Sequence, residues 1–253
     1  MADNLRESFR TIARSRTGGE VRELRGVSIA SAGVAFQMFN AAFLSSPVAS
    51  EAELEQRILT AAVHFQARGL EWSYWVCHDW LADKPARRAR KVFERLGLRH
   101  AVELPGMIAE AVGQPARPLP ELAIRRVDGG RTRDAFCAIG SECFHVPPPW
   151  FQEVFESPSV WERFASFVGY LDGEPVSTAS VVASPGGLGV YNVATVPRRQ
   201  RCGYGEAVMR HALAEARREH EMQRAILQST PAGLRLYERM GFRAVTRISV
   251  YST

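Results

Sequence analysis

The chain has 253 residues, of which 46% are hydrophobic and 23% are charged. These values are ordinary for a globular protein and exclude a disordered tail or a collagen-like repeat. The net charge is +5, and lysine occurs only at Lys84 and Lys91, so nearly all of the positive charge is arginine. The arginines are scattered and no aromatic residues alternate with a basic stripe, which argues against a nucleic-acid partner. A ligand that carries phosphate accounts equally well for a local group of arginines.

The cysteines and the first residues favour a reduced, cytoplasmic setting. The four cysteines form no CxxC pair and are too few for a disulfide framework. The opening residues, "MADNLRESFRTIARSR", contain no apolar stretch of the kind that a secretory signal needs.

An uncharged run at residues 26–50 raises the question of a membrane span. A span would bury Gln37, Asn40, Pro47 and several serines in hydrocarbon, at high cost. We therefore expect a buried strand followed by a helix here, and no membrane partner.

A proline-rich segment divides the chain almost in half. Pro115, Pro118 and Pro120 fall within six residues of "VGQPARPLPEL", and proline both removes backbone donors and disfavours helix before it. The length allows one large domain or two of about 120 to 130 residues. We expect a domain at 1–115 and another at 121–253.

The second half predicts a mixed α/β domain, an α+β arrangement with a mixed sheet. Glycine-containing turns separate three strand-like runs, which predicts an antiparallel meander. Thr230 is the expected N-cap of the last helix, with Pro231 at its first position and Gly241 just after its end. The expected elements are a strand at 122–127, helices at 131–144 and 146–155, strands at 164–172, 175–183 and 189–196, a helix ending near 220, a strand at 224–229, a helix at 230–240 and a strand at 242–252.

The first half repeats the end of the second. A strand at 72–77 precedes a helix that we expect over 85–99, ending at Gly97. Its "KVFERLGLR" aligns with "RLYERMGFR" at a constant offset of 144 residues, so that Glu94, Arg95 and Gly97 match Glu238, Arg239 and Gly241. Two amphipathic helix ends can be alike by chance, but we favour a diverged internal duplication.

The stretch "RRQRCGYGEAVM" at 198–209 sets arginines and glycines at the start of a helix. Free amides at a helix N-terminus bind anions, and glycines let the ligand approach; a tight, capped surface turn is the alternative. A Walker loop needs Gly-Lys-Ser/Thr, and no lysine is present. A dinucleotide fingerprint needs glycine or alanine where Val208 stands, and an acidic residue after a strand that ends here in Gln228 and Ser229.

The pattern that fits is Q/R-x-x-G-x-G/A, formed by Gln200, Gly203 and Gly205 after the strand "VYNVATVP". With "YERMGF" about 30 residues further on, residues 122–253 resemble the GNAT superfamily of N-acetyltransferases. The resemblance implies the GNAT acyl-CoA N-acyltransferase fold, in tandem if the duplication holds, with acetyl-CoA as cosubstrate, an amine as acceptor and no metal.

The resemblance also implies residue roles. The main chain of Ala194, Thr195 and Val196 would bind the pantetheine arm, and the N–H of Val196 or its neighbour would stabilise the oxyanion. The residues expected around the pyrophosphate are Gln200, Arg201, Cys202, Gly203, Tyr204, Gly205 and Glu206. Arg198, Arg199 or Arg201 could add electrostatic attraction.

Tyr237 occupies the position of the general acid in many GNAT enzymes, and its alternative role is that of a core aromatic. A phenol with a pKa near 10 stays protonated at neutral pH, which suits an acid. Asn192 stands where some relatives carry a glutamate, and it could orient a water molecule. The general base is left unassigned, with four residues in the region that usually walls the acceptor site: Glu142, His145, Glu153 and Glu156.

The first half lacks the features that catalysis needs. Phe93 stands where the offset puts Tyr237, and no glycine occurs between Val34 and Arg68. This half resembles a degenerate GNAT unit, with Trp72, Trp75 and Trp80 in its core or at the domain interface. The chain as a whole is expected to be an acetyl-CoA-dependent N-acetyltransferase, with a non-catalytic acyl-CoA-binding regulatory module as the alternative and a homodimer left open.

Overall fold

The computed structural model of the chain describes all residues from 1 to 253. Its strands are β1 (Glu20–Leu24), β2 (Val27–Ser31), β3 (Asn40–Leu44), β4 (Ser73–Cys77), β5 (Arg99–Ala109), β6 (Ala123–Arg126), β7 (Ala165–Leu171), β8 (Glu174–Ser184), β9 (Gly187–Thr195), β10 (Ala225–Gln228) and β11 (Arg243–Ser252). Its helices are α1 (Ala2–Arg14), α2 (Glu51–Gln66), α3 (Asp83–Arg95), α4 (Gly130–Phe144), α5 (Pro148–Val154), α6 (Pro158–Arg163), α7 (Tyr204–His220) and α8 (Pro231–Arg239), with short 3-10 turns at η1 (Gln37–Phe39), η2 (His78–Trp80) and η3 (Pro197–Arg199).

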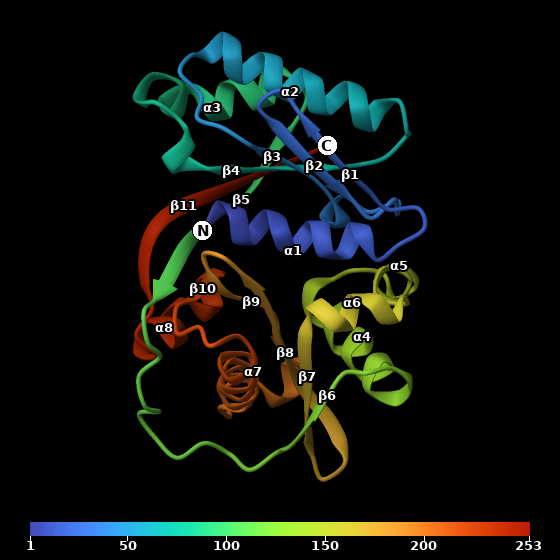
Figure 1. The fold of residues 1–253 in the computed structure, drawn as a ribbon, viewed down its shortest axis with the longest axis vertical. Helices are drawn as coiled ribbons and strands as arrows, with labels where there is room; N and C mark the ends of the chain where they lie inside the picture. Colours follow the sequence, from blue (N-terminus) through green and yellow to red (C-terminus); the bar gives the residue numbers. More distant parts are fainter.

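All eleven strands belong to one mixed sheet, in the order β1-β2-β3-β4-β11-β5-β10-β9-β8-β7-β6 (Figure 1). The mixed α/β class expected from the sequence is thereby confirmed. The elements expected in the second half occur in their predicted order, with α6 as an addition. Left-handed backbone at Asp172 and Gly173 forms the β7–β8 turn, and the Thr230 hydroxyl caps α8 by accepting from the N–H of Gly233 at 3.4 Å.

The uncharged run at 26–50 is wrongly predicted as a strand followed by a helix. It contains two antiparallel strands, β2 and β3, joined through the short turn η1. All ten residues of these strands are buried. Burial on both faces removes the alternation that marks a strand, and a continuous apolar run can then be read as a helix.

The two halves exchange their last strands. β11, from the second half, lies between β4 and β5 of the first half and pairs antiparallel with both. β5, from the first half, pairs antiparallel with β10 of the second. In Figure 1 the red β11 leaves the lower half and runs into the upper one. The sheet of each half is therefore completed by a strand of the other.

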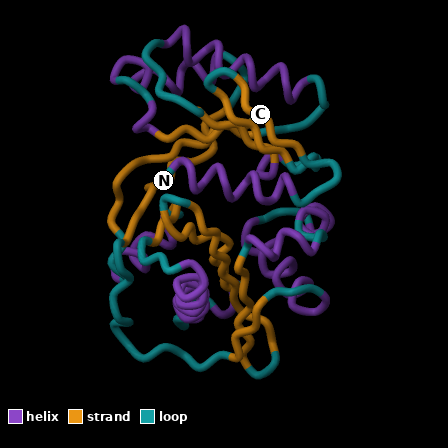
Figure 2. Tube along the Cα trace, viewed as in Figure 1, coloured by secondary structure: helices purple, strands orange, loops and turns teal.

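Helix α1 lies between the two halves (Figure 2). Phe9 packs edge-on against Phe43 of β3 and Trp75 of β4, with ring centroids 5.3 Å apart in each pair. Ile12, three residues later on the helix, packs against the aromatic core of the second half. The sequence analysis did not predict this helix, although residues 5, 9 and 12 have helical spacing.

Candidate active site

The loop between η3 and α7 carries a row of free amides. Arg201 and Gly203 have left-handed backbone, with φ of 64° and 86°, and no side chain caps the helix. None of the six N–H groups of residues 201–206 donates to a protein acceptor, and the first amide that does is that of Ala207, to the carbonyl of Gly203 at 3.0 Å. Free amides and the helix dipole together favour an anion at this point.

The two glycines of the loop allow two close approaches. A Cβ at Gly205 would lie 3.1 Å from Oγ1 of Thr195, so glycine lets α7 begin directly against the end of β9. A Cβ at Gly203 would lie 3.2 Å from Pro120 and 3.8 Å from a guanidinium nitrogen of Arg117. The proline-rich segment after β5 therefore passes against the loop.

Four arginines surround the loop; two of them form ion pairs with a glutamate and two form none. Arg198 and Arg199 both pair with Glu174, at 2.6 and 3.3 Å, and their hydrogen bonds lower the pKa of that carboxyl. Arg117 and Arg201 are exposed and form no ion pair. The sequence analysis considered Arg198, Arg199 and Arg201 and missed Arg117, because the linker lies some 80 residues before the loop.

The end of β9 is separated from its parallel neighbour. β9 and β10 pair only at Leu188 and Gly189, so the rest of that side of β9 is unpaired down to Thr195. A register shift against β8 occurs between Thr178 and Ser180, opposite Asn192, whose φ is 51°. Bulges of this kind bend a strand and re-aim its groups, often beside an active site.

The expected oxyanion role of the Val196 N–H is wrong. This N–H donates to the carbonyl of Val176 at 3.0 Å, within the pairing with β8. Because neighbouring residues of a strand face opposite sides, the N–H of Thr195 faces the unpaired side. Thr195 is the neighbour that the sequence analysis also considered. The side chain of Gln200 folds back and donates to the Thr195 carbonyl at 3.2 Å.

Tyr237 lies on α8, with its ring across Gly233, where a Cβ would come within 2.6 Å of ring atom Cε2. The side chain is buried, and burial raises the pKa of Tyr237 to about 12. Its hydroxyl forms no hydrogen bond to the protein. The phenol therefore keeps its proton at neutral pH and has a free O–H to donate.

A cavity of about 480 Å³ brings Tyr237 and Asn192 together. Its wall also includes Val193, Gln228 and Thr230, around the gap between β9 and β10. The sequence analysis did not identify these last three, and nothing in their local pattern marks them. None of the four candidates for the base lines this cavity, and all of them are exposed: Glu142, His145, Glu153 and Glu156.

The corresponding place in the first half is closed. Ser50 accepts from the N–H of Glu53 at 3.2 Å, and the Glu53 carboxylate accepts from the N–H of Ala49 at 2.8 Å. This variant of a capping box, in which the carboxylate accepts from the residue before the N-cap, caps α2 with the protein's own groups. The Arg57 guanidinium donates to the carbonyls of Ser46 and Pro47, the second at 2.9 Å. No glycine-rich loop occurs there, as the sequence predicts.

The strand gap and the tyrosine are also missing from the first half. β3 pairs with β4 from Ala41 to Phe43, one residue before the strand ends. Phe93 is fully buried and stacks on Tyr251 with ring centroids 3.9 Å apart. Of the three tryptophans, Trp72 lies in the core of the first half. Trp75 and Trp80 pack against α1 instead. The ring of Trp80 lies beneath the guanidinium of Arg6.

The structure was found to hold neither a metal-binding cluster nor a membrane-spanning helix. No group of three or more histidine, cysteine, aspartate or glutamate side chains is placed to hold a metal ion. No helix combines the length and the hydropathy needed to cross a membrane.

Comparison with protein families gives one match. Residues 162–244 match the family model described as "Acetyltransferase (GNAT) domain". No curated protein matches the chain. The family uses acetyl-CoA as cosubstrate, and the match supports acyl-CoA-dependent N-acyltransferase activity in general.

Solved structures resemble the chain over nearly its whole length. A GCN5-related N-acetyltransferase from Kribbella flavida has a TM-score of 0.74 at 17% identity, covering 100% of this chain and 95% of its own. One from Sphaerobacter thermophilus has a TM-score of 0.62 at 16% identity, covering 90% and 76%. A tandem GNAT protein of the clavulanic acid biosynthesis pathway has a TM-score of 0.55 at 12% identity, covering 90% and 78%. Residues 162–244 are therefore a GNAT acetyltransferase domain, in a chain whose fold is that of GNAT proteins, a tandem GNAT protein among them.

Proposed function

We propose that this chain is an N-acetyltransferase that moves an acetyl group from acetyl-CoA to an amine by direct attack. The observation that carries the proposal is the row of six free amides at residues 201–206, beside the unpaired end of β9. Both features lie within the residues that match the GNAT family model. A pyrophosphate at the amides would put the pantetheine arm along the unpaired side of β9, at the main chain of Thr195, while the Ala194 carbonyl accepts from Ser177 of β8.

The cavity suggests how the reaction proceeds. The amine lone pair would attack the thioester carbonyl carbon, the oxyanion would accept from the N–H of Thr195, and the carbon–sulfur bond would break. The proton lost by the nitrogen ends on the CoA sulfur. A thiol has a pKa near 8.5 and Tyr237 one of about 12, so full transfer from the phenol is uphill. Tyr237 would therefore act mainly by donating a hydrogen bond to the sulfur as it gains charge.

We propose a division of roles between two units, 1–115 and 121–253. The second unit would bind acetyl-CoA and catalyse, with Asn192 orienting a water molecule or the amine. The first would be a degenerate GNAT unit, which is supported by its capping box at Ser50 and Glu53 and its closed β3–β4 pair. A carboxylate fixed beside a helix start repels a pyrophosphate rather than binding it.

One observation favours the alternative, a regulatory module that binds acyl-CoA without turning it over. The cavity contains no carboxylate or histidine that could act as a base. Release of free thiol from acetyl-CoA in the presence of amines separates the two functions, because a module that only binds releases none.

The test of cofactor binding uses Gly205→Asp, which adds a side chain and a negative charge beside the free amides. Acetyl-CoA at about 100 times its Kd should stabilise the wild type by roughly 2.7 kcal/mol, and the variant should lose that thermal shift. Gly18→Asp is the matched control, since a Cβ at Gly18 meets nothing within 4 Å. An undiminished shift in Gly205→Asp would mean that the loop does not hold the phosphates.

A further inference from the structure

The wall of the 480 Å³ cavity contains no charged side chain. Of its 27 residues, 20 are hydrophobic, and the only titratable groups are the phenols of Tyr191 and Tyr237. The volume falls within the range of small-molecule sites, which are mostly apolar with a few placed polar groups. The composition of this wall constrains whatever molecule reacts there.

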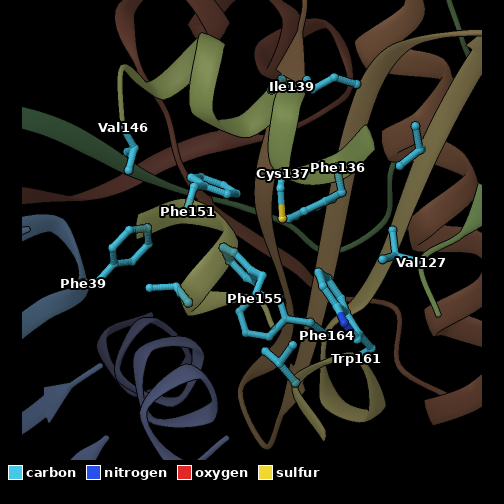
Figure 3. Close-up of a cluster of buried hydrophobic side chains, with 14 of the residues drawn as sticks. Phe39, Val127, Phe136, Cys137, Ile139, Val146, Phe151, Phe155, Trp161 and Phe164 are labelled. Atoms are coloured by element: carbon cyan, nitrogen blue, oxygen red, sulfur yellow. The ribbon is translucent and has the colours of Figure 1, made fainter. Parts of the chain in front are cut away.

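Aromatic rings from both halves form much of the wall. Phe39 of the first half lies 6.0 Å from Phe151 and 6.4 Å from Phe155, centroid to centroid, with its ring edge-on to both. Figure 3 shows Phe39 directed at these two rings across the boundary between the halves. Phe9 of α1 and Trp75 of β4 also line the cavity.

Four polar groups of the wall lie around the strand gap, and the remaining polar wall residues, Ser8, Gln37, Ser73 and Ser252, come from α1, η1, β4 and β11. Asn192 lies on β9, Gln228 and Thr230 flank the end of β10, and the free hydroxyl of Tyr237 completes the group. All of these are neutral. The cavity thus has neutral polar groups at the proposed reaction centre, and the rest of its wall is mostly aromatic and aliphatic with no charge.

An alkylammonium ion fits this environment poorly. Burying a cation without a paired anion is costly, and no carboxylate faces the cavity to offset the cost. An alkylamine with a pKa like that of lysine, near 10.4, is neutral in only about one molecule in 10³ at pH 7. An aromatic amine has its lone pair delocalised into the ring, is neutral at pH 7 and needs no base before it attacks.

From this wall we infer that the acceptor is a neutral, weakly basic amine on an aromatic body, of the arylamine class, and not a polyamine or other cation. The inference rests on the proposed acetyltransferase function and deepens it. The nitrogen lone pair forms the new carbon–nitrogen bond, the carbon–sulfur bond breaks, and the proton of the arylamine passes to the sulfur. Arylamine and acetyl-CoA give the N-aryl acetamide and CoA thiol, and no further reactant is required.

Two isomers provide the test. 4-Ethylaniline and 2-phenylethylamine have the same formula and similar size, but at pH 7 the first is neutral and the second is a cation. With the full-length protein and acetyl-CoA, release of free thiol should give a kcat/KM at least tenfold higher for 4-ethylaniline, and spermidine should be the poorest acceptor. A wild type that prefers 2-phenylethylamine or spermidine overturns the inference and leaves the acetyltransferase in place.

A near-isosteric change of charge in the wall tests whether the cavity determines the preference for neutral amines. Gln37 lines it and is part-buried, so Gln37→Glu adds a carboxylate to the wall with little change in shape. The ratio of the two kcat/KM values should move at least fivefold toward 2-phenylethylamine. Gln152→Glu makes the same change at an exposed position of α5 outside the cavity and should leave the ratio unaltered. An equal ratio in all three proteins contradicts the inference.

The remaining outcomes separate this inference from the proposed function. If no amine releases thiol although acetyl-CoA still raises the melting temperature, the transferase proposal fails. Calorimetric titration of the two amines then decides the inference: tighter binding of 4-ethylaniline than of 2-phenylethylamine supports a site for neutral amines, and equal or reversed affinities overturn it. If octanoyl-CoA is turned over faster than acetyl-CoA and excludes 4-ethylaniline, the cavity holds an acyl chain and the inference is wrong.

Discussion

The hydroxyl of Tyr191, on β9, donates a hydrogen bond of 2.5 Å to Oδ1 of Asn4, on α1. The amide nitrogen of Asn4 directs its two hydrogens at three acceptors, the carbonyls of Val182 and Gly187 and the Ser184 hydroxyl, which lie at 2.8 to 3.2 Å. The Asn4 side chain is fully buried. One polar side chain of the first half thus satisfies several buried groups of the second.

Asn4→Leu should therefore destabilise the protein. The change keeps the volume but leaves the Tyr191 hydroxyl and two carbonyls without this partner, at a cost of about 2 to 3 kcal/mol. Urea denaturation measures the loss. Tyr191→Phe removes only one donor and should cost about 1 kcal/mol. If both variants lose the same amount of stability, the hydrogen bonds donated by the Asn4 amide nitrogen contribute nothing.

Tyr237→Phe should lower kcat at least tenfold, because it removes the O–H and keeps the ring over Gly233. Loss of a hydrogen-bond donor to charge that develops in the transition state typically costs about 10² to 10³ in rate. The thermal shift with acetyl-CoA should persist, since the phosphates are held at residues 201–206. Phe93→Tyr is the control, and it should create no second site because the first half has no free amides. A kcat within twofold of wild type, with chemistry rate-limiting, would reduce Tyr237 to a core aromatic.

Ionisation of Tyr237 should not limit activity below about pH 11. Burial raises its pKa to about 12, so the folded protein keeps the proton where an exposed tyrosine, with a pKa near 10, would lose it. The same shift stabilises the fold fully below pH 10, and this contribution is lost as the pH rises from 10 toward 12. A profile of kcat with 4-ethylaniline should show no decline from pH 7 to 10. A decline with a midpoint near 10 would show a normal, exposed phenol.

Arg117→Ala should raise the Kd for acetyl-CoA by about two- to fivefold, since an exposed ionic contact contributes roughly 0.5 to 1 kcal/mol. The effect should shrink in high salt, because screening weakens exposed charges. Arg87→Ala is the matched control, an exposed arginine of α3 with no ion pair. Calorimetric titration gives both constants. Acetyl-pantetheine, which lacks phosphate, should show equal kcat/KM with both variants; a loss confined to Arg117→Ala would point to misfolding of the linker.

The two halves should unfold in one transition. β11 pairs with β4 and β5 at once, so neither half has a complete sheet alone. Scanning calorimetry should give a single peak with equal calorimetric and van't Hoff enthalpies. Val250→Asp, a buried change in β11, should lower the whole transition. Two separate peaks in the wild type would show that the halves are energetically independent.

The sequence predicted the second half well because its signals are local. Turn residues, the N-cap at Thr230 and the loop glycines each act within a few residues. The similarity between the two helix ends allowed the first half to be compared with the second. Helix α1 was missed because four of its buried residues are polar or charged, which hides the apolar face. They are Asn4, Arg6, Ser8 and Thr11.

The exchange of strands and the wall of the cavity could not be predicted in this way. Both depend on which edges pair across more than 100 residues, and a local pattern does not encode the partner. Phe39 and Trp75 are unremarkable aromatics in the first half's sequence, yet they line the cavity of Tyr237. The oxyanion role expected for the Val196 N–H was wrong for a related reason. This N–H forms a hydrogen bond to the Val176 carbonyl, and that bond depends on the register of β8 and β9.

The place of β11 affects how the protein folds during its synthesis. The ribosome makes β4 and β5 well before residues 243–252, yet these two strands reach one another only through β11. Until that segment emerges, the first half has two unpaired strand edges, and exposed edges of this kind invite pairing with other chains. Chaperones that cover strand edges on the nascent chain should therefore raise the yield of folded protein, and a slow step that ends with the docking of β11 should dominate refolding.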